Sequence, residues 1–137
     1  MTQSDSPFNR SPPAAAVRPS SLAVIGLGAI GGSIAWQARL AGVPRVLGYS
    51  PKRGEGVEAL KVGAVGELVG SPEAAAREAE LTVLAAPPSA TLDLLGRLGP
   101  VLSDGAFLTD VCSVKAAIVR QAAAAGLGDR FAGAHPL

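Results

Sequence analysis

The chain alternates short apolar runs with longer alanine-rich stretches from Ser21 onward. The short runs, bounded by Gly, Pro or Ser, predict strands near 21–26, 45–49, 65–69, 81–86, 106–110 and 131–134. The longer stretches predict helices at about 29–41, 52–62, 72–79, 89–98 and 114–125. Because strands that alternate with helices form βαβ units, the pattern predicts an α/β domain whose mainly parallel sheet is buried on both faces.

Local signals mark several of the predicted helix ends. Ser71, Pro72 and Glu73 supply an N-cap, a first-turn proline and an early acid. Three glycines occupy positions where C-terminal helix caps are expected: Gly42, Gly63 and Gly126.

The beginning of the chain does not follow this pattern. Residues 1–20 contain four prolines and no periodic apolar face, so we expect a disordered tail before a single domain over 21–137. The tail lacks the apolar run of about 7–15 residues that a secretory signal requires. No later stretch is apolar over the roughly 18–20 residues of a membrane span. We therefore expect a soluble, cytoplasmic protein with no membrane partner.

Composition narrows the function classes. A length of 137 residues fits one domain, and 48% hydrophobic against 17% charged residues suit a globular core. The net charge of +1 provides no overall field for polyanions, so we expect no nucleic-acid partner. A single cysteine, Cys112, excludes an internal disulfide. A single histidine, His135, excludes the usual Cys/His zinc clusters, so no metal is expected.

The most informative motif follows the first predicted strand. The sequence Gly-Leu-Gly-Ala-Ile-Gly matches the G-x-G-x-x-G pattern between a strand and a helix. In dinucleotide-binding folds Gly26 would form the tight turn, Gly28 would let the backbone approach the pyrophosphate, and Gly31 would let helix and strand pack closely. Backbone N–H groups, including those of Ala29 and Ile30, would hold the phosphates at the helix N-terminus. The alternative is a tight strand-to-helix turn without a ligand. No Lys-Ser or Lys-Thr pair follows, which excludes the phosphate loop of nucleotide triphosphatases.

The end of the second predicted strand bears on which cofactor this turn would hold. An NAD site usually places an acid there, about 20 residues after the glycines, to accept hydrogen bonds from the ribose. Here the strand ends at Ser50, and Lys52 and Arg53 follow. A hydroxyl and two cations suit a 2′-phosphate, so we expect NADP to be preferred and NAD to be possible. The alternative is that Lys52 and Arg53 only form the solvated first turn of a helix.

Three further segments complete a likeness to a known family. Leu-Ala-Ala-Pro-Pro stands at 84–88, Thr-Asp-Val-Cys-Ser-Val-Lys at 109–115 and Phe-Ala-Gly-Ala-His-Pro at 131–136. With the opening Gly-Leu-Gly-Ala-Ile-Gly-Gly-Ser turn, this series resembles the cofactor domain of the prephenate and arogenate dehydrogenases of tyrosine biosynthesis. The resemblance covers roughly residues 21–137. It implies a Rossmann-type doubly wound fold, with Ala86 and Pro87 beside the cofactor.

The resemblance also implies a reaction. In this family hydride passes from the ring carbon that bears the 4-hydroxyl to the nicotinamide, carbon dioxide is lost, and the ring becomes aromatic. The small-molecule substrate would be prephenate, giving 4-hydroxyphenylpyruvate, or arogenate, giving tyrosine. Carried over by motif, His135 would polarise or deprotonate the hydroxyl, and Ser113 would hydrogen-bond the same region. An imidazole after the sixth strand stands at the edge where open α/β sheets bind ligands, and it can accept a proton at cellular pH.

Several of these residues also have structural interpretations. Ser113 could be the N-cap of the fifth helix, and both of its roles can coexist. Asp110 would more simply fix its turn through local backbone hydrogen bonds. Lys115 matches the family without a role that the residues suggest. Cys112 is expected to be a small buried residue, and Trp36 is expected to pack rather than to contact the cofactor.

The sequence departs from the family at its end. Members of the family continue past Gly-x-His-Pro into a helical domain that forms the dimer and closes over the substrate, whereas this chain stops at Leu137. We therefore expect the helical C-terminal dimerisation domain to be absent and a homodimer only for a full-length form. We also expect the isolated chain to bind cofactor without useful turnover. The alternatives are a truncated or standalone nucleotide-binding or regulatory module without catalysis, and a dehydrogenase acting on phosphogluconate or imines.

Overall fold

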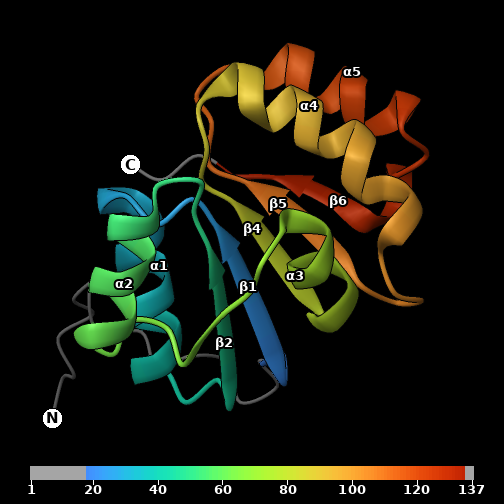
Figure 1. Ribbon diagram of the computed structural model, residues 1–137. Helices are drawn as coiled ribbons and strands as arrows, with labels where there is room; N and C mark the ends of the chain where they lie inside the picture. The colour runs from blue at the N-terminus through green and yellow to red at the C-terminus, as the bar shows by residue number, and fades with distance from the viewer. Residues whose placement is uncertain (1–17, 135–137) are drawn as a thin grey trace, which may run out of the picture.

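A computed structural model describes residues 18–134, which contain a six-stranded sheet (Figure 1). The strands are β1 (Ser21–Ile25), β2 (Arg45–Tyr49), β3 (Glu67–Leu68), β4 (Leu81–Leu84), β5 (Phe107–Asp110) and β6 (Phe131–Gly133). They lie in the order β3-β2-β1-β4-β5-β6, and every neighbouring pair is parallel. This is the sheet of the Rossmann-type doubly wound fold, so the predicted fold class is confirmed.

The helices connect these strands and cover both faces of the sheet (Figure 1). They are α1 (Ala29–Leu40), α2 (Arg53–Lys61), α3 (Pro72–Glu78), α4 (Pro88–Leu98) and α5 (Lys115–Ala124), with short 3₁₀ turns at Gly99–Val101 and Gly128–Arg130. One buried cluster joins the sheet to α3, α4 and α5. The other joins it to α1 and α2. Among the described residues, no helix is long and apolar enough to cross a membrane.

The central strand shows why the sequence contains continuous apolar runs. All five residues of β1 are buried, and successive side chains point to opposite faces. Ala23 and Ile25 belong to the cluster under α3, α4 and α5, whereas Leu22 and Val24 belong to the cluster under α1 and α2. A strand buried on both faces requires apolar residues at every position.

The chain changes direction across the sheet at β1. After β1 the chain builds outward through β2 and β3, and it then returns so that β4 pairs with the other side of β1. The register places Ile25 beside both Tyr49 and Leu84, so three strand ends meet at one carboxyl edge. In open α/β sheets such a switch point leaves a crevice in which ligands bind.

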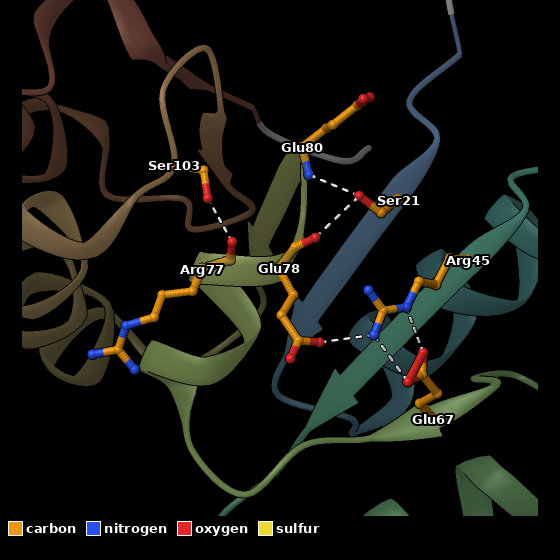
Figure 2. Close-up of polar contacts among 7 residues, drawn as sticks. All are labelled: Ser21, Arg45, Glu67, Arg77, Glu78, Glu80 and Ser103. Carbon is orange, nitrogen blue, oxygen red and sulfur yellow. Dashed lines mark hydrogen bonds and ion pairs between the residues drawn. The ribbon is translucent and has the colours of Figure 1, made fainter.

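A polar cluster ties the opposite, amino-terminal edge of the sheet together (Figure 2). Arg45 at the start of β2 donates to Glu67 of β3 at 2.6 Å and to Glu78 of α3 at 2.8 Å. The hydrogen bond and the negative charge of Glu67 raise the pKa of Arg45, and Arg45 in turn lowers the pKa of Glu67. The Ser21 hydroxyl accepts from the N–H of Glu80 at 3.0 Å and donates to the carbonyl of Glu78 at 3.3 Å. These contacts fix the end of α3 against the starts of the strands.

The predicted elements are all present, with shifts at some ends. The third strand shortens from 65–69 to Glu67–Leu68, because it is an edge strand flanked by glycines and pairs with β2 over only two positions. The fourth ends at Leu84 instead of residue 86, because the next residue turns its carbonyl toward the glycine turn. The helix signals are confirmed. Ser71 accepts from the N–H of Ala74 at 3.1 Å, and the three predicted C-terminal glycines have positive φ: Gly42, Gly63 and Gly126.

Parts of two predictions lie outside the described residues. These are residues 1–17 of the predicted tail and His135. Within the part of the tail that the structure describes, Ser20 binds the Glu80 carboxylate through its N–H at 2.9 Å and its hydroxyl at 2.8 Å. Ser20 is therefore fixed to the sheet edge rather than disordered.

Candidate functional site

The first glycine of the turn is required by its backbone and by its neighbours. Gly26 has φ of +97°, in the left-handed region that glycine alone enters easily. Its N–H donates to the carbonyl of Tyr49 at 2.8 Å. A Cβ at this position would collide with the carbonyl group of Ala85, whose carbon would lie 2.9 Å away. The turn therefore packs directly on the chain that leaves β4.

The third glycine allows α1 to lie close to β1. A Cβ on Gly31 would collide with the carbonyl of Gly26 and would lie 3.1 Å from the Cβ of Ala85. Since two of the three obstacles are backbone atoms, no side-chain rotation could relieve the overlap. The structural roles predicted for Gly26 and Gly31 agree with this geometry.

The second glycine differs, because it faces open space. Gly28 is the N-cap residue of α1 and makes no side-chain cap. A Cβ built there would have one neighbour within 4 Å among the described residues, a carboxylate oxygen of Glu55 at 3.8 Å. The first-turn residues Ala29 and Ile30 are exposed. An uncapped helix N-terminus with room beside its backbone suits a phosphate group.

The turn opens into a cleft of about 510 Å³ at the carboxyl ends of β1, β2 and β4. Its lining includes six of the residues predicted to bind the cofactor: Gly26, Gly28, Ser50, Lys52, Ala86 and Pro87. Arg53 does not line this cleft and instead borders a smaller hollow beyond Tyr49 and Pro51. Ala29, Ile30 and Gly31 are also absent from its lining, so six of the ten predicted residues surround this cleft.

A second hollow, of about 480 Å³, lies at the amino-terminal edge of the sheet. Glu78, Glu80 and Asp104 are among its lining residues, and no residue of the glycine turn reaches it. Among the described residues its lining includes no Lys or Arg, and acidic side chains without cations oppose the binding of an anionic dinucleotide. The cleft at the glycine turn also has two acids, Glu55 and Asp93, but they are accompanied by Lys52 and Arg97. The cleft at the glycine turn is therefore the better candidate site.

One residue of the cleft was not expected from the sequence. Glu55, the third residue of α2, turns its carboxylate toward the end of β2, where its Oε2 accepts from the Ser50 hydroxyl at 2.9 Å. The prediction that no acid stands at this end of the strand is correct for position 50. It is wrong for the site, because the Glu55 carboxylate reaches it from the following helix. The only signal was an acid in the first turn of the predicted helix.

The loop after β5 holds the predicted Ser113. This residue is exposed, and α5 begins at Lys115 with Val114 as its N-cap and no side-chain cap. The alternative in which Ser113 caps this helix is therefore wrong. The hydroxyl is not used by the helix end, which leaves it accessible at the carboxyl edge of the sheet.

Asp110 and Lys115 enclose that loop. The Asp110 carboxylate is fully buried, accepts from the N–H of Cys112 at 2.9 Å and pairs with the Lys115 ammonium at 2.7 Å. The turn-fixing role predicted for Asp110 agrees with the first contact. Lys115, for which the sequence suggested no role, neutralises the buried carboxylate.

The remaining two residues considered in the sequence, Cys112 and Trp36, do not line the cleft. Cys112 is 6% exposed and packs in the core, as expected. Trp36 lines a groove between α1 and α2 rather than the cleft at the end of β2, and 41% of it is exposed. Its packing is therefore only partial.

The doubly wound sheet, the glycine turn and the cleft at the β1–β4 crevice together define a dinucleotide-binding domain. The family model for the nucleotide-binding domain of prephenate dehydrogenase matches residues 34–137. The chain therefore belongs to the prephenate dehydrogenase family, which is a family of oxidoreductases. Because the match begins at Ile34, the glycine turn is assigned on its geometry.

Relatives and solved structures agree with this assignment. Prephenate dehydrogenase of Lactococcus lactis subsp. cremoris (strain MG1363) is 36% identical over an alignment of 118 residues, and the alignment covers 83% of this chain and 33% of that protein. Synechocystis arogenate dehydrogenase superposes with a TM-score of 0.76 at 34% identity, covering 85% of this chain and 40% of the other. Prephenate dehydrogenase from A. aeolicus, in complex with hydroxyphenyl propionate and NAD+, gives a TM-score of 0.77 at 28% identity, covering 85% and 41%. The chain thus spans 33–41% of the length of these proteins.

Proposed function

We propose that residues 21–137 form the cofactor domain of an enzyme that oxidatively decarboxylates prephenate or arogenate with NAD or NADP. The observation that carries the proposal is the uncapped N-terminus of α1, which opens into the crevice between β1 and β4 in a chain of the prephenate dehydrogenase family. This is the place where dinucleotides bind in doubly wound folds.

The residues around the cleft fit a dinucleotide. Gly28 leaves space for a diphosphate beside the backbone, and the N–H groups of Ala29 and Ile30 would donate to it. Ala86 and Pro87 follow β4 on the far side of the crevice, where they would contact the nicotinamide half. The bound nicotinamide would supply the hydride acceptor.

The substrate chemistry is assigned to Ser113 and His135. The carboxyl ends of β5 and β6 are neighbours, because Asp110 pairs in register with Gly133. Ser113 follows the first of these strands and His135 follows the second. In our proposal His135 accepts the proton of the substrate hydroxyl while Ser113 hydrogen-bonds the same group.

The finer preference for NADP over NAD remains part of the proposal. It is supported by Lys52, which is 79% exposed beside the cleft, and by the exposed Arg53, since both could approach a 2′-phosphate. The absence of an acid at the ribose site no longer supports this preference, because the Glu55 carboxylate lies beside Ser50. Replacing Arg53 with Ala should weaken binding of NADP and leave that of NAD unchanged, and calorimetric titration of both cofactors measures the difference. Equal losses would contradict the assignment.

A second candidate function is a nucleotide-binding or regulatory module without catalysis. It would use the same glycine turn and cleft and would need no group that acts on a substrate. The proposed enzyme would act in the cytoplasm, and its full-length form would be a homodimer.

The decisive experiment uses the complete reading frame that contains these residues. The purified protein is assayed with prephenate and with arogenate, each with NAD and NADP, and reduced nicotinamide is followed by absorbance. We expect substrate-dependent reduction, and we expect His135→Asn to lower kcat by about 100-fold or more with unchanged cofactor affinity. The isolated 137-residue chain should bind cofactor without useful turnover. Cofactor binding without reduction in the complete protein would favour the module instead.

A further inference from the structure

We infer that Glu55 is a specificity-determining residue, which contacts the adenosine ribose and lowers the affinity for NADP relative to NAD. The preference for NADP proposed above from Lys52 and Arg53 is then smaller than it would be without this acid. The inference rests on the proposed function only in requiring that the cleft binds a nicotinamide dinucleotide. It concerns an acid in a helix, at a position where the fold does not ordinarily supply one, since the usual acid stands at the end of the second strand.

The Glu55 carboxylate lies beside both Ser50 and the glycine turn. Glu55 lies between the two parts of the cleft that an adenosine diphosphate must join. Its Oε2 accepts from Ser50 at the end of β2 at 2.9 Å, and its Oε1 lies 3.8 Å from the site of a Cβ on Gly28 in the phosphate-binding turn. The ribose that connects adenine to the diphosphate occupies this interval in doubly wound folds.

The Glu55 carboxylate does not cap the N-terminus of its own helix, α2. A glutamate at the third helical position often accepts from the N–H of the N-cap residue. Here the N–H of that residue, Lys52, donates instead to the Ser50 hydroxyl at 3.2 Å. The single donor of that hydroxyl points at Glu55. An ionised carboxylate has about four lone-pair sites, so Glu55 retains capacity for the two hydroxyls of a ribose.

The same arrangement opposes a 2′-phosphate. While Ser50 donates to Glu55, its hydroxyl has no proton left for a phosphate oxygen. The nearest cation, Lys52, stands 4.0 Å from the Glu55 carboxylate, so its charge is partly compensated before any ligand binds. A phosphate at the 2′ position would place a second negative group beside a carboxylate that is 36% exposed, where screening by water is incomplete.

The test compares two substitutions that remove the same charge from α2. The affinities of NAD and NADP are measured by calorimetry for the 137-residue chain, for Glu55→Gln and for Glu58→Gln. Glu58 is exposed and stands one turn further along the helix. Circular dichroism confirms that each variant is folded.

We expect Glu55→Gln to raise the ratio of NADP affinity to NAD affinity by about tenfold or more, and Glu58→Gln to change it by less than about twofold. An unchanged ratio in Glu55→Gln, or equal changes in both variants, would overturn the inference. If the unsubstituted chain bound neither dinucleotide, the proposed function itself would fail, which is a distinct result. Glu55→Asp keeps the charge but withdraws it from the ribose, and we expect it to weaken NAD binding without the gain in NADP binding.

Discussion

The ammonium group of Lys115 lies 2.8 and 2.7 Å from the two carboxylate oxygens of Asp110, a side chain that is completely buried. Both ends of the loop that contains Ser113 are thereby fixed to one ion pair. The same pair reaches the next strand. The N–H of Ala134 donates to the Asp110 carbonyl at 3.2 Å, and a Cβ on Gly133 would lie 3.3 Å from the Lys115 side chain. The loop that contains Ser113 and the end of β6 at Gly133 and Ala134 are therefore held by a common ion pair.

Removing the cation should destabilise the protein. In Lys115→Met the Asp110 carboxylate remains buried without its counter-charge, and breaking one partner of a buried pair costs about 3–5 kcal/mol. Because 29% of the Lys115 side chain is exposed, water can partly replace it, and we expect a loss near 3 kcal/mol. Urea denaturation at neutral pH measures the change.

The control and the double variant make this prediction specific. Arg120→Met removes a positive charge from an exposed position of the same helix and should change the free energy of unfolding by less than about 0.5 kcal/mol. Combining Lys115→Met with Asp110→Asn should recover part of the loss, because no charge then remains buried. A single Lys115→Met variant as stable as the unsubstituted chain would show that the pair does not anchor this edge.

Two glycines of one turn should respond differently to alanine. Gly31→Ala places a Cβ against the backbone of Gly26, so we expect a loss of about 3 kcal/mol or more, or failure to fold. Gly28→Ala meets no atom closer than 3.8 Å and keeps an ordinary φ of −70°, so its stability should fall by no more than about 1 kcal/mol, because alanine is a poorer N-cap residue. Its methyl group would instead obstruct the diphosphate and weaken cofactor binding by about tenfold.

Thermal melts and calorimetric titration of both variants separate these effects. Gly32→Ala is the matched control, because it lies in the same helix and its Cβ would make only a contact of 3.7 Å with the Leu27 carbonyl. We expect it to fold and to bind cofactor like the unsubstituted chain. Equal cofactor affinity in Gly28→Ala would contradict the phosphate role of the turn.

The glycine turn was predictable because local sequence determines it. Gly26 and Gly31 are needed for reasons that act within a few residues, namely a positive φ and a close helix-to-strand contact, and a motif records such requirements. The central strands β1 and β4 were predictable for a similar reason, since burial on both faces requires continuous apolar runs. The edge strands β3 and β6 are mostly exposed and were predicted less well by this signal, as the shortening of β3 shows.

Residues whose roles depend on where their side chains point in the fold were not predictable in the same way. Glu55 enters the cleft because the first turn of α2 faces back toward the end of β2. The pattern of apolar and polar residues does not indicate this orientation. Lys115 likewise acquires its role only when the loop before α5 folds back so that its ammonium reaches Asp110. The sequence placed Lys115 in a segment that resembles the family, but it gave Glu55 no place in the site, and it could not show which atoms meet at either position.

The polar cluster at the amino-terminal edge predicts a pH dependence (Figure 2). Hydrogen bonding and charge from Arg45 lower the pKa of Glu67 in the folded protein. A carboxyl group of this kind stabilises the fold above its unfolded pKa of about 4.3, and its contribution disappears as the pH falls through the lower, folded value. The free energy of unfolding should therefore decrease below about pH 5.

Glu67→Gln tests the assignment of this acid sensitivity. The variant lacks the negative charge that pairs with Arg45, so it should be less stable than the unsubstituted chain at pH 7. The difference should shrink as the pH approaches about 3, because Glu67 of the unsubstituted chain then becomes protonated whereas the glutamine does not titrate. Glu58→Gln, an exposed change outside the cluster, should show a smaller pH-dependent difference. Denaturation with urea at several pH values measures each curve. A stability difference for Glu67→Gln that does not vary with pH would contradict the role of the ion pair.

Two buried threonines should respond in opposite ways to valine. Thr82 and Thr91 are both fully buried, but the Thr82 hydroxyl has no hydrogen-bond partner among residues 18–134, whereas the Thr91 hydroxyl donates to the carbonyl of Ala86 at 3.1 Å. A buried hydroxyl without a partner costs about 1–3 kcal/mol, so Thr82→Val should raise the free energy of unfolding by about 1 kcal/mol. Valine retains the branched shape that a central strand favours. Thr91→Val removes a satisfied hydrogen bond and should lower stability by about 1 kcal/mol. Urea denaturation of the two variants measures both changes, and a Thr82→Val variant less stable than the unsubstituted chain would show that the hydroxyl has a partner in solution.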